Sequence, residues 1–244
     1  FPPLAKTHSE CQSNQCLEVE GGGESKCLAD TDCLPKEPTA PNSLIPVQET
    51  ENIEISAGQE PLFPEKLKTA ASQEQTKGGL KRILIKLVNG EKKYASLAEL
   101  TELLGLKIPS ELIVNFQNYT LFVYQPAGNE SELCQIAQIS DPNCSGPRLG
   151  LAIEIENQTG LKELLKNWEK TMASDLKSLI LVEIRETETS AFQDDSSRQT
   201  AAIRYKNLPI SPVALNYGFL NNLLFITTSK NTLYQVLDFE KTTE

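Results

Sequence analysis

The chain has 244 residues, of which 39% are hydrophobic and 23% charged, enough for one domain with a core of its own plus a smaller module. Its formal net charge of −10 disfavours nucleic acid and anionic membrane surfaces as partners, because both attract clustered Lys and Arg side chains. No run approaches the roughly 20 apolar residues of a membrane helix, and "FPPLAK" lacks the form of a signal peptide. Any membrane attachment is therefore expected only through a segment upstream of Phe1.

Residues 1–34 are predicted to form a small Cys-rich module, because four of the six cysteines and the single histidine lie in "HSECQSNQCLEVEGGGESKCLADTDC". These four cysteines are Cys11, Cys16, Cys27 and Cys33. We favour two disulfides, with the three possible pairings left open, since an even and clustered cysteine set is typical of oxidising compartments. The alternative is a zinc site that draws on His8 and these cysteines, but the two close C-x2-C pairs of common zinc modules are absent. No metal or other cofactor is expected.

Residues 35–79 are predicted to be an extended linker. Six of the fourteen prolines lie between residues 35 and 64, and proline removes backbone donors and favours extended chain. Within this segment only the short run "NIEISA" has the pattern of an edge strand.

From residue 80 the pattern becomes that of a globular α+β domain, which is expected to span residues 80–244. The run "LKRILIKLVNGEKKYAS" indicates a hairpin that turns at Asn89-Gly90. Ser96 and Glu99 have the spacing of a capping box, and Gly105 is placed to end the helix that follows.

The middle of the domain is predicted to hold strands and one helix. The run "ELIVNFQNYTLFVYQP" is interpreted as two strands that fold back near Gln117-Asn118. Cys134 and Cys144 flank the loop "QIAQISDPN", where a disulfide would stabilise by about 2–3 kcal/mol. The strand "RLGLAIEIEN" and the helix "LKELLKNWEKTM" follow, each with one regular apolar face.

The last third repeats this plan. One hairpin is expected around residues 194–197 and another at Asn221-Asn222, and Ser229 is expected to cap a closing helix. Hairpins predict a mainly antiparallel sheet with helices on one face, and two similar units near residues 110–175 and 190–240 suggest a duplication.

The residue types do not favour an enzyme. The domain after residue 79 has no histidine, and the chain contains no nucleotide-binding, metalloprotease or serine-hydrolase motif. The carboxylate pairs Glu154/Glu156 and Asp194/Asp195 are interpreted as solvated, and the oxygens of Asp30 and Asp32 are too few for a calcium loop. Four sequons are compatible with glycosylation, at Asn118, Asn129, Asn143 and Asn157.

Two stretches resemble bacterial envelope proteins. "HSECQSNQCLEVEGGGESKC" resembles the H-x2-C-x4-C element of uncharacterised surface or secreted proteins of small-genome bacteria, from which it departs by Glu20 and three consecutive glycines. The segments "IRYKNLP" and "VALNYGFLNNLLFITTSKNTLYQVLD" are similar to the end of an uncharacterised family of membrane-anchored extracytoplasmic domains. The resemblance implies a cell-envelope location, with paired strands and a closing helix at the C-terminal end.

These observations together predict an extracytoplasmic, secreted or cell-surface protein that is not an enzyme. We expect a structural or interaction role, as a component of a cell-surface or appendage assembly that acts through protein–protein contacts. The partner is a protein, which includes a second copy of the chain in an oligomer or filament. The alternative is a secreted binding module for a small molecule or glycan.

Overall fold

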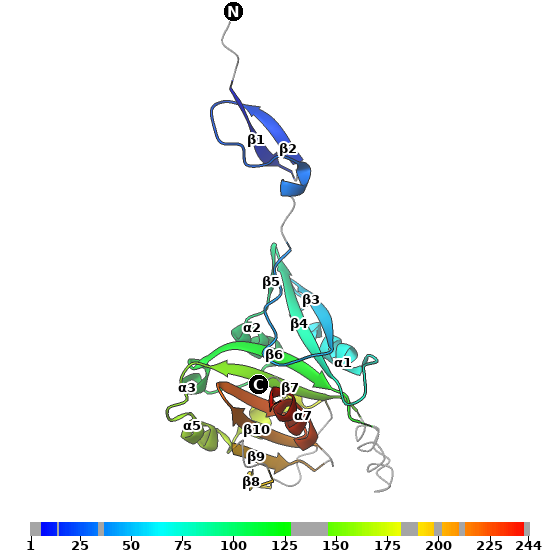
Figure 1. The fold of residues 1–244 in the computed structure, drawn as a ribbon, viewed down its shortest axis with the longest axis vertical. Coiled ribbons are helices and arrows are strands. Elements are labelled where there is room, and N and C mark those ends of the chain that lie inside the picture. The colour runs from blue at the N-terminus through cyan, green and yellow to red at the C-terminus, as the bar shows by residue number, and fades with distance from the viewer. Residues whose placement is uncertain are drawn as a thin grey trace, which may run out of the picture. The chain divides into compact units, whose positions relative to one another are not determined.

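The computed structural model describes residues 6–13, 15–33, 37–127, 146–181, 190–197, 202–209 and 213–241. The chain divides into two compact units (Figure 1), Phe1–Thr39 with Gly90–Lys93 and Ala40–Asn89 with Tyr94–Glu244. Both hydrophobic core clusters belong to the second unit.

The first unit contains a Cys-rich module built on one hairpin. Strands β1 (Thr7–Gln12) and β2 (Gln15–Glu20) pair antiparallel, and the short 3-10 helix η1 (Asp30–Cys33) follows them. Because few of its side chains are buried, hydrophobic burial alone cannot hold this module together.

The second unit contains eight strands of a nine-stranded sheet, in the order β3-β4-β6-β7-β11-β10-β9-β8, and the ninth strand, β5, pairs with β4 outside this path. Along this order every pair is antiparallel except β3 and β4, which are parallel. The predicted mainly antiparallel α+β architecture is therefore confirmed. The strands are β3 (Glu49–Ser56), β4 (Leu80–Asn89), β5 (Glu91–Tyr94), β6 (Phe116–Tyr124), β7 (Arg148–Ile155), β8 (Gln193–Asp195), β9 (Ala202–Asn207), β10 (Ala214–Leu220) and β11 (Leu223–Thr227).

Two of the turns that the sequence predicted are present. Gly90 takes the left-handed φ of 86° at the β4–β5 turn, and Asn221 takes a φ of 53° at the β10–β11 turn. Asparagine and glycine adopt this conformation at lower cost than other residues, which is why both turns were visible in the sequence.

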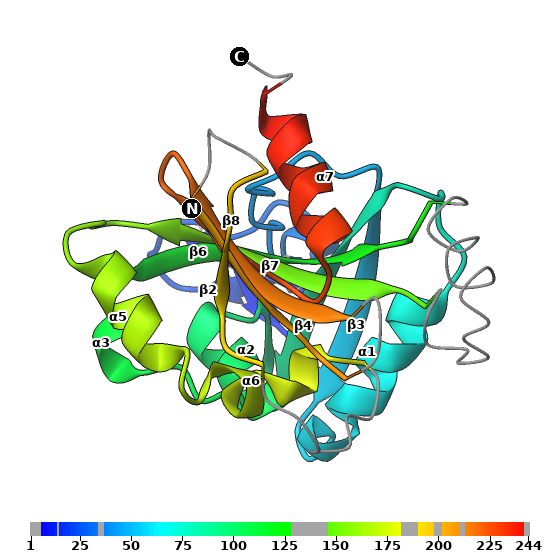
Figure 2. The same ribbon diagram turned by 90° about the horizontal axis from the view of Figure 1, so that it is seen from below.

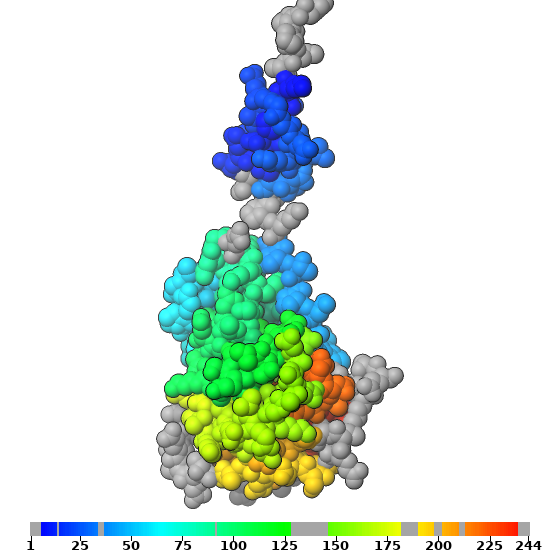
Figure 3. Space-filling view, turned by 90° about the vertical axis from the view of Figure 1, so that its left-hand side faces the viewer, coloured from blue at the N-terminus to red at the C-terminus, as the bar shows by residue number. Residues whose placement is uncertain are grey.

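The helices are α1 (Phe63–Ser72), α2 (Leu97–Leu104), α3 (Ser110–Ile113), α5 (Leu161–Trp168), α6 (Met172–Asp175) and α7 (Lys230–Lys241), with the 3-10 turns η2 (Glu60–Leu62) and η3 (Lys177–Leu179). The capping box of α2 is formed by Ser96 and Glu99, and Gly105 ends this helix with a φ of 61°. Figure 3 shows α2, α3 and α5, coloured green to yellow-green, as adjoining surfaces on the side of the second unit that faces the viewer.

Both faces of the sheet are covered. Along β6, Leu121 and Val123 belong to one core cluster, whereas Phe122 and Tyr124 belong to the other. Helices α1, α2, α3, α5 and α6 pack on the first face and α7 packs on the second (Figure 2). The expectation of helices on one face is therefore wrong, because the apolar residues of α7 cover side chains that alternation along the strands directs to the opposite side.

The two segments suggested as repeats, near residues 110–175 and 190–240, place their helices on different faces of the sheet. Helix α5 follows the β6–β7 pair on the first face, and α7 follows the β10–β11 pair on the second. A duplication that relates the antiparallel neighbours β7 and β11 by a twofold axis normal to the sheet would place α5 and α7 on the same face. The two helices lie on opposite faces. The duplication stays a prediction.

The segment expected as two strands near Gln117-Asn118 is one strand. β6 runs from Phe116 to Tyr124, and its register with β7 shifts between Phe116 and Tyr119. The two polar residues therefore mark a bulge rather than a turn, since a bulge absorbs extra residues without reversing the chain.

Much of the expected linker is integral to the second unit. Ile53 and Ile55 of β3 and Phe63 and Leu67 of α1 lie in the first core cluster. Pro64 stands in the first turn of α1, where a missing amide hydrogen costs nothing, so here proline marks a helix start. The expectation of an extended linker over residues 35–79 is therefore corrected for residues 49–72.

We expect Gly150→Ala to destabilise the second unit strongly. Gly150 stands opposite Phe122 in the β6–β7 pair, and a Cβ atom at this position would lie 2.2 Å from the Phe122 ring. Overpacking of this kind lowers the free energy of unfolding by about 1–3 kcal/mol. The measurement is urea unfolding followed by fluorescence of Trp168, the single tryptophan.

The matched control is Gly218→Ala on β10, where the nearest atom, Ile203 Cγ1, would be 3.3 Å away. The control is expected to lose less stability than Gly150→Ala. Equal losses would show that the Phe122 ring does not require a glycine beside it.

Candidate functional site

The structure pairs the four N-terminal cysteines as two disulfides. Cys11 is bonded to Cys33 and Cys16 to Cys27, with Cα–Cα distances of 5.2 Å and 5.8 Å. Cys11 and Cys16 stand opposite each other in the β1–β2 hairpin, yet each bonds to the segment that follows the hairpin. The two bridges therefore fasten residues 27–33 onto the hairpin, and the pairing that the sequence left open is resolved.

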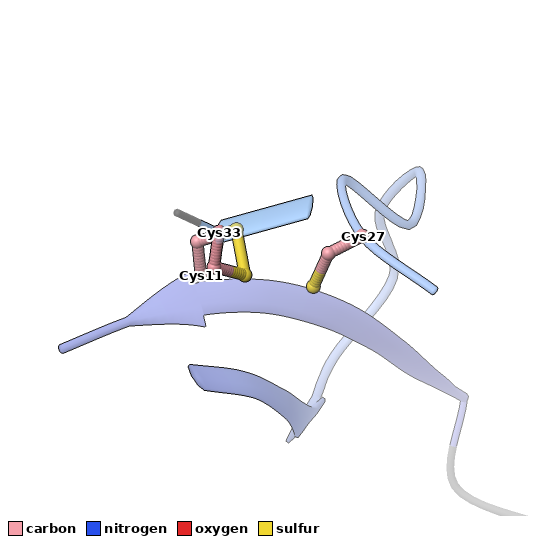
Figure 4. Close-up of side chains that lie close together, drawn as sticks. All are labelled: Cys11, Cys27 and Cys33. Atoms are coloured by element: carbon pink, nitrogen blue, oxygen red, sulfur yellow. A yellow bond between two sulfur atoms is a disulfide. The ribbon is translucent and has the colours of Figure 1, made fainter. Parts of the chain in front are cut away.

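The zinc alternative uses the same sulfur atoms. The sulfurs of Cys11, Cys27 and Cys33 lie within 4.8 Å of one another (Figure 4). Each of these cysteines is in a disulfide, however, and a disulfide sulfur has no thiolate charge to offer a zinc ion. The geometry therefore supports the disulfide interpretation.

His8 is occupied elsewhere in the module. By strand alternation it lies on the hairpin face opposite Cys11. Its Nδ1 is 3.2 Å from the carbonyl oxygen of Gly21, and its Nε2 is 3.3 Å from the carboxylate of Glu10. A hydrogen bond from the Lys26 ammonium and a weaker one from His8 hold the pKa of Glu10 below its usual value. The histidine thus joins the glycine segment to the hairpin and does not approach the sulfurs.

The most distinctive surface feature of the module is the Leu28 turn, which we define as residues 27–33. Asp32 Oδ2 accepts hydrogen bonds from the backbone amides of Leu28 and Ala29, at 2.7 Å and 3.1 Å. Asp30 Oδ1 accepts one from the amide of Cys16 at 2.8 Å. The two carboxylates considered for calcium therefore bind backbone amides, and they fix the turn.

Leu28 itself is 94% exposed, although the residue before it, Cys27, is buried and bridged. A nearly free apolar side chain thus projects from a backbone held by two disulfides and three side-chain hydrogen bonds. Sequence reasoning did not single out Leu28. The available signal was its place as one of the few large apolar residues in a polar, Cys-rich stretch.

One polar cluster in the second unit has the residue types of a nucleophilic site. Tyr234 donates a hydrogen bond to Asp195, Ser197 Oγ lies 2.6 Å from Tyr234 Oη, and Lys230 Nζ lies 3.0 Å from Asp195 Oδ2. The Asp195 side chain is only 5% exposed, so the expectation that it is solvated is wrong. It is buried because α7 packs against the end of the β8–β9 hairpin.

The charged groups of this cluster pair with one another. Burial acts to lower the pKa of Lys230, but the hydrogen bond to Asp195 and the charge interactions with Asp195 and Tyr234 together outweigh it, and the pKa is raised. Lys230 is thus held as a cation and cannot serve as the base that a serine nucleophile needs. The cluster ties the β8–β9 hairpin to α7, and Lys230 also stacks over the Tyr205 ring at 4.1 Å.

A second cluster joins α5 to β9 and β10. Arg204 donates to both carboxylate oxygens of Glu169 and, at 2.8 Å, to Asp194, and the Tyr217 hydroxyl donates to Glu169 at 2.7 Å. The hydrogen bond to Glu169 raises the pKa of Arg204, and burial raises that of Tyr217. Each polar group is paired, so this network also fixes packing.

The remaining predicted site residues lie apart from these clusters. Asn118 donates from its amide to Glu154 at 2.7 Å, and Asn157 accepts from the Thr159 amide at 2.8 Å. Glu156 is exposed, as expected. The other candidates lie outside the described residues, so their pairing or modification stays a prediction: Cys134, Cys144, Asn129 and Asn143.

Two features bear on the compartment. The two disulfides are typical of an oxidising, extracytoplasmic environment. Within the described ranges, no helix has both the length and the apolar character needed to cross a bilayer.

We expect Cys16→Ser/Cys27→Ser to unfold the module and leave the second unit intact. Opening a bridge between residues separated by 11 positions removes about 3 kcal/mol, a large loss for a module with few buried side chains. The core clusters of the second unit contain no side chain of residues 6–33, so its stability is expected to be unchanged. The measurement pairs the NMR ring signals of His8 with urea unfolding followed by Trp168, the single residues of their types.

The His8 signals are expected to move to the positions of an unfolded chain. A dispersed His8 signal in the variant would contradict the assignment of the disulfides as the main support of the module.

We expect Asp195→Asn to lower the free energy of unfolding at pH 7 by about 1–3 kcal/mol, with a smaller loss in acid. Burial acts to raise the pKa of Asp195, but hydrogen bonds from Tyr234, Ser197 and Lys230 lower it overall. A carboxyl whose pKa is depressed by folding stabilises fully above its unfolded pKa, near 4, and progressively less below it. Urea unfolding from pH 7 to pH 3 measures the difference between wild type and variant.

The control is Asp194→Asn, whose side chain is 82% exposed, and a loss below about 1 kcal/mol is expected. A difference between wild type and Asp195→Asn that is constant from pH 7 to pH 3 would contradict the depressed pKa.

Comparison of the chain with protein-family models, with curated proteins and with solved structures finds no match. The resemblance to bacterial envelope proteins therefore stays a prediction, and function has to be argued from the residues themselves.

Proposed function

We propose that this chain is an extracytoplasmic structural or interaction protein of the cell surface, which uses the Leu28 turn to contact a partner protein. The observation that carries this proposal is the 94% exposure of a leucine on a backbone fixed by two disulfides. Secretion and a place in a surface assembly are parts of the proposal, and the disulfides support them because such bonds persist in oxidising compartments.

A fixed turn suits recognition for an energetic reason. Binding usually costs about 0.5–1.5 kcal/mol for each side chain or loop residue that must be ordered. Here the Asp32 and Asp30 carboxylates and the Cys16–Cys27 bridge have already ordered the backbone around Leu28. Most of the apolar area that Leu28 buries would therefore contribute to affinity.

The charges around the turn indicate the chemistry of the partner. Residues 6–33 hold six acidic and two basic side chains, a net charge of −4, and the whole chain has −10. A second copy of the chain would bring its own net negative charge to these acidic residues, and like charges repel. The surface that fits is an apolar pocket for Leu28 surrounded by Lys and Arg side chains.

The proposal is tested with a photo-crosslinking amino acid at position 28 of the full chain. The protein is incubated with the extracytoplasmic fraction of its own source, irradiated and analysed by mass spectrometry. We expect one discrete adduct, whose yield falls when an excess of unlabelled wild-type chain competes and stays constant when Leu28→Ser competes.

The matched control carries the same crosslinker at Glu24, an exposed residue of the same module. The same adducts from both positions, or none from position 28, would overturn the role of the Leu28 turn. An adduct of twice the chain mass would overturn the basic partner in favour of self-assembly.

A further inference from the structure

The second unit has an open groove between the edge strand β3 and helix α1. It has a volume of about 520 Å³ and is lined on the strand side by Glu51, Asn52 and Glu54, and on the helix side by Leu62, Glu65 and Lys66. β3 is the last strand in the order of the sheet, and within the described residues no strand pairs with its outer edge. The groove runs beside the outer edge of β3, where the Glu54 carbonyl already accepts from Lys66 and the Ser56 amide donates to Gln59, so the backbone groups before Glu54 are those that can accept a further strand.

Acidic side chains outnumber basic ones along this groove. Glu51, Glu54 and Glu65 contribute three carboxylates, and Lys66 is the single basic residue that lines it. The Lys66 ammonium already donates to the Glu54 carbonyl at 2.7 Å and to Gln59 Oε1 at 3.0 Å. This lysine is thus held against the strand, and the carboxylates of Glu51 and Glu65 dominate the field that a ligand meets.

The groove also offers one apolar contact. Leu62, at its helix side, is 52% exposed, whereas the next residue, Phe63, is fully buried in the core. A ligand with alternating basic and apolar side chains can place its cations beside the carboxylates and an apolar side chain on Leu62. Alternation of this kind is the natural period of an extended strand.

We propose that this groove binds an extended, lysine- or arginine-rich segment of another protein, which adds to the outer edge of β3 as a further strand. Main-chain hydrogen bonds to an edge strand supply affinity in such complexes, and side chains at alternate positions supply specificity. The part of β3 before Glu54 sets the length of the segment that can pair, because Lys66 and Gln59 already occupy backbone groups of Glu54 and Ser56.

Two alternative occupants fit less well. In a filament of identical chains, the other end of the sheet would meet this edge, but that end is the short strand β8 (Gln193–Asp195), which brings the exposed Asp194 carboxylate to an acidic strand. A glycan would need aromatic platforms, and no aromatic side chain lines the groove. This site is independent of the Leu28 turn, because it belongs to the other unit.

The first experiment uses the full chain and two fluorescein-labelled octapeptides, one of alternating Lys and Val and one of alternating Glu and Val. Fluorescence anisotropy at low salt is expected to show binding of the Lys-Val peptide alone. The double variant Glu51→Lys/Glu65→Lys is expected to lose at least about tenfold in affinity for this peptide and to gain binding of the Glu-Val peptide.

The matched control is Glu156→Lys/Glu163→Lys, which changes the net charge equally at two exposed residues outside the groove. If this control weakens binding as much as the groove variant, the peptide is attracted to the acidic chain as a whole and the proposal is overturned. Absence of any binding by wild type at low salt also overturns it.

Two further peptides separate strand addition from charge attraction. Both have the Lys-Val sequence with every second backbone nitrogen methylated, and each lacks the amide hydrogen-bond donors of a different edge at unchanged charge. Their affinities are expected to differ at least tenfold. Equal affinity of both would overturn strand addition. Leu28→Ser is expected to leave all these affinities unchanged, so failure of the groove and failure of the Leu28 turn can be told apart.

Discussion

The second unit depends on one constraint, the burial of both faces of its central strands. Along β6, Leu121 and Val123 point to one cluster and Phe122 and Tyr124 to the other, so neither face can be left in water. Helices α1, α2, α3, α5 and α6 cover the first face, and α7 covers the second (Figure 2). The ion-pair networks follow from this arrangement, because the ends of α5 and of α7 have to be joined to the neighbouring strands.

Those networks also hold charged side chains of the described residues in fixed pairs. Glu169 and Arg204 pair within one network, and Asp195 and Lys230 within the other, so each charge is stabilised by its neighbour. The pKa of Asp195 is lowered and the pKa values of Arg204 and Lys230 are raised, so the pairing favours the charged form of each of these three groups. Strong polar pairing therefore serves packing in this unit.

The module at the start of the chain is stabilised differently. Its hairpin buries few side chains, and two disulfides take the place of a hydrophobic core. Because covalent bonds and two aspartate caps fix the backbone, an apolar side chain such as Leu28 can remain exposed without a cost in local order. The acidic groove beside β3 is the counterpart on the second unit, where carboxylates line a strand edge with which no described strand pairs.

The sequence by itself determined the local features: the turns at Gly90 and Asn221, the cap of α2 at Ser96, the antiparallel hairpins and the disulfide-rich start. Each depends on a few neighbouring residues whose conformational preferences are strong. Only the tertiary structure decided the pairing of the cysteines, the second helical face, the place of β3 and α1 in the sheet unit and the burial of Asp195. These depend on contacts between segments far apart in the chain, which local periodicity does not encode. A count of prolines also does not distinguish a proline at a helix start from a proline in a linker.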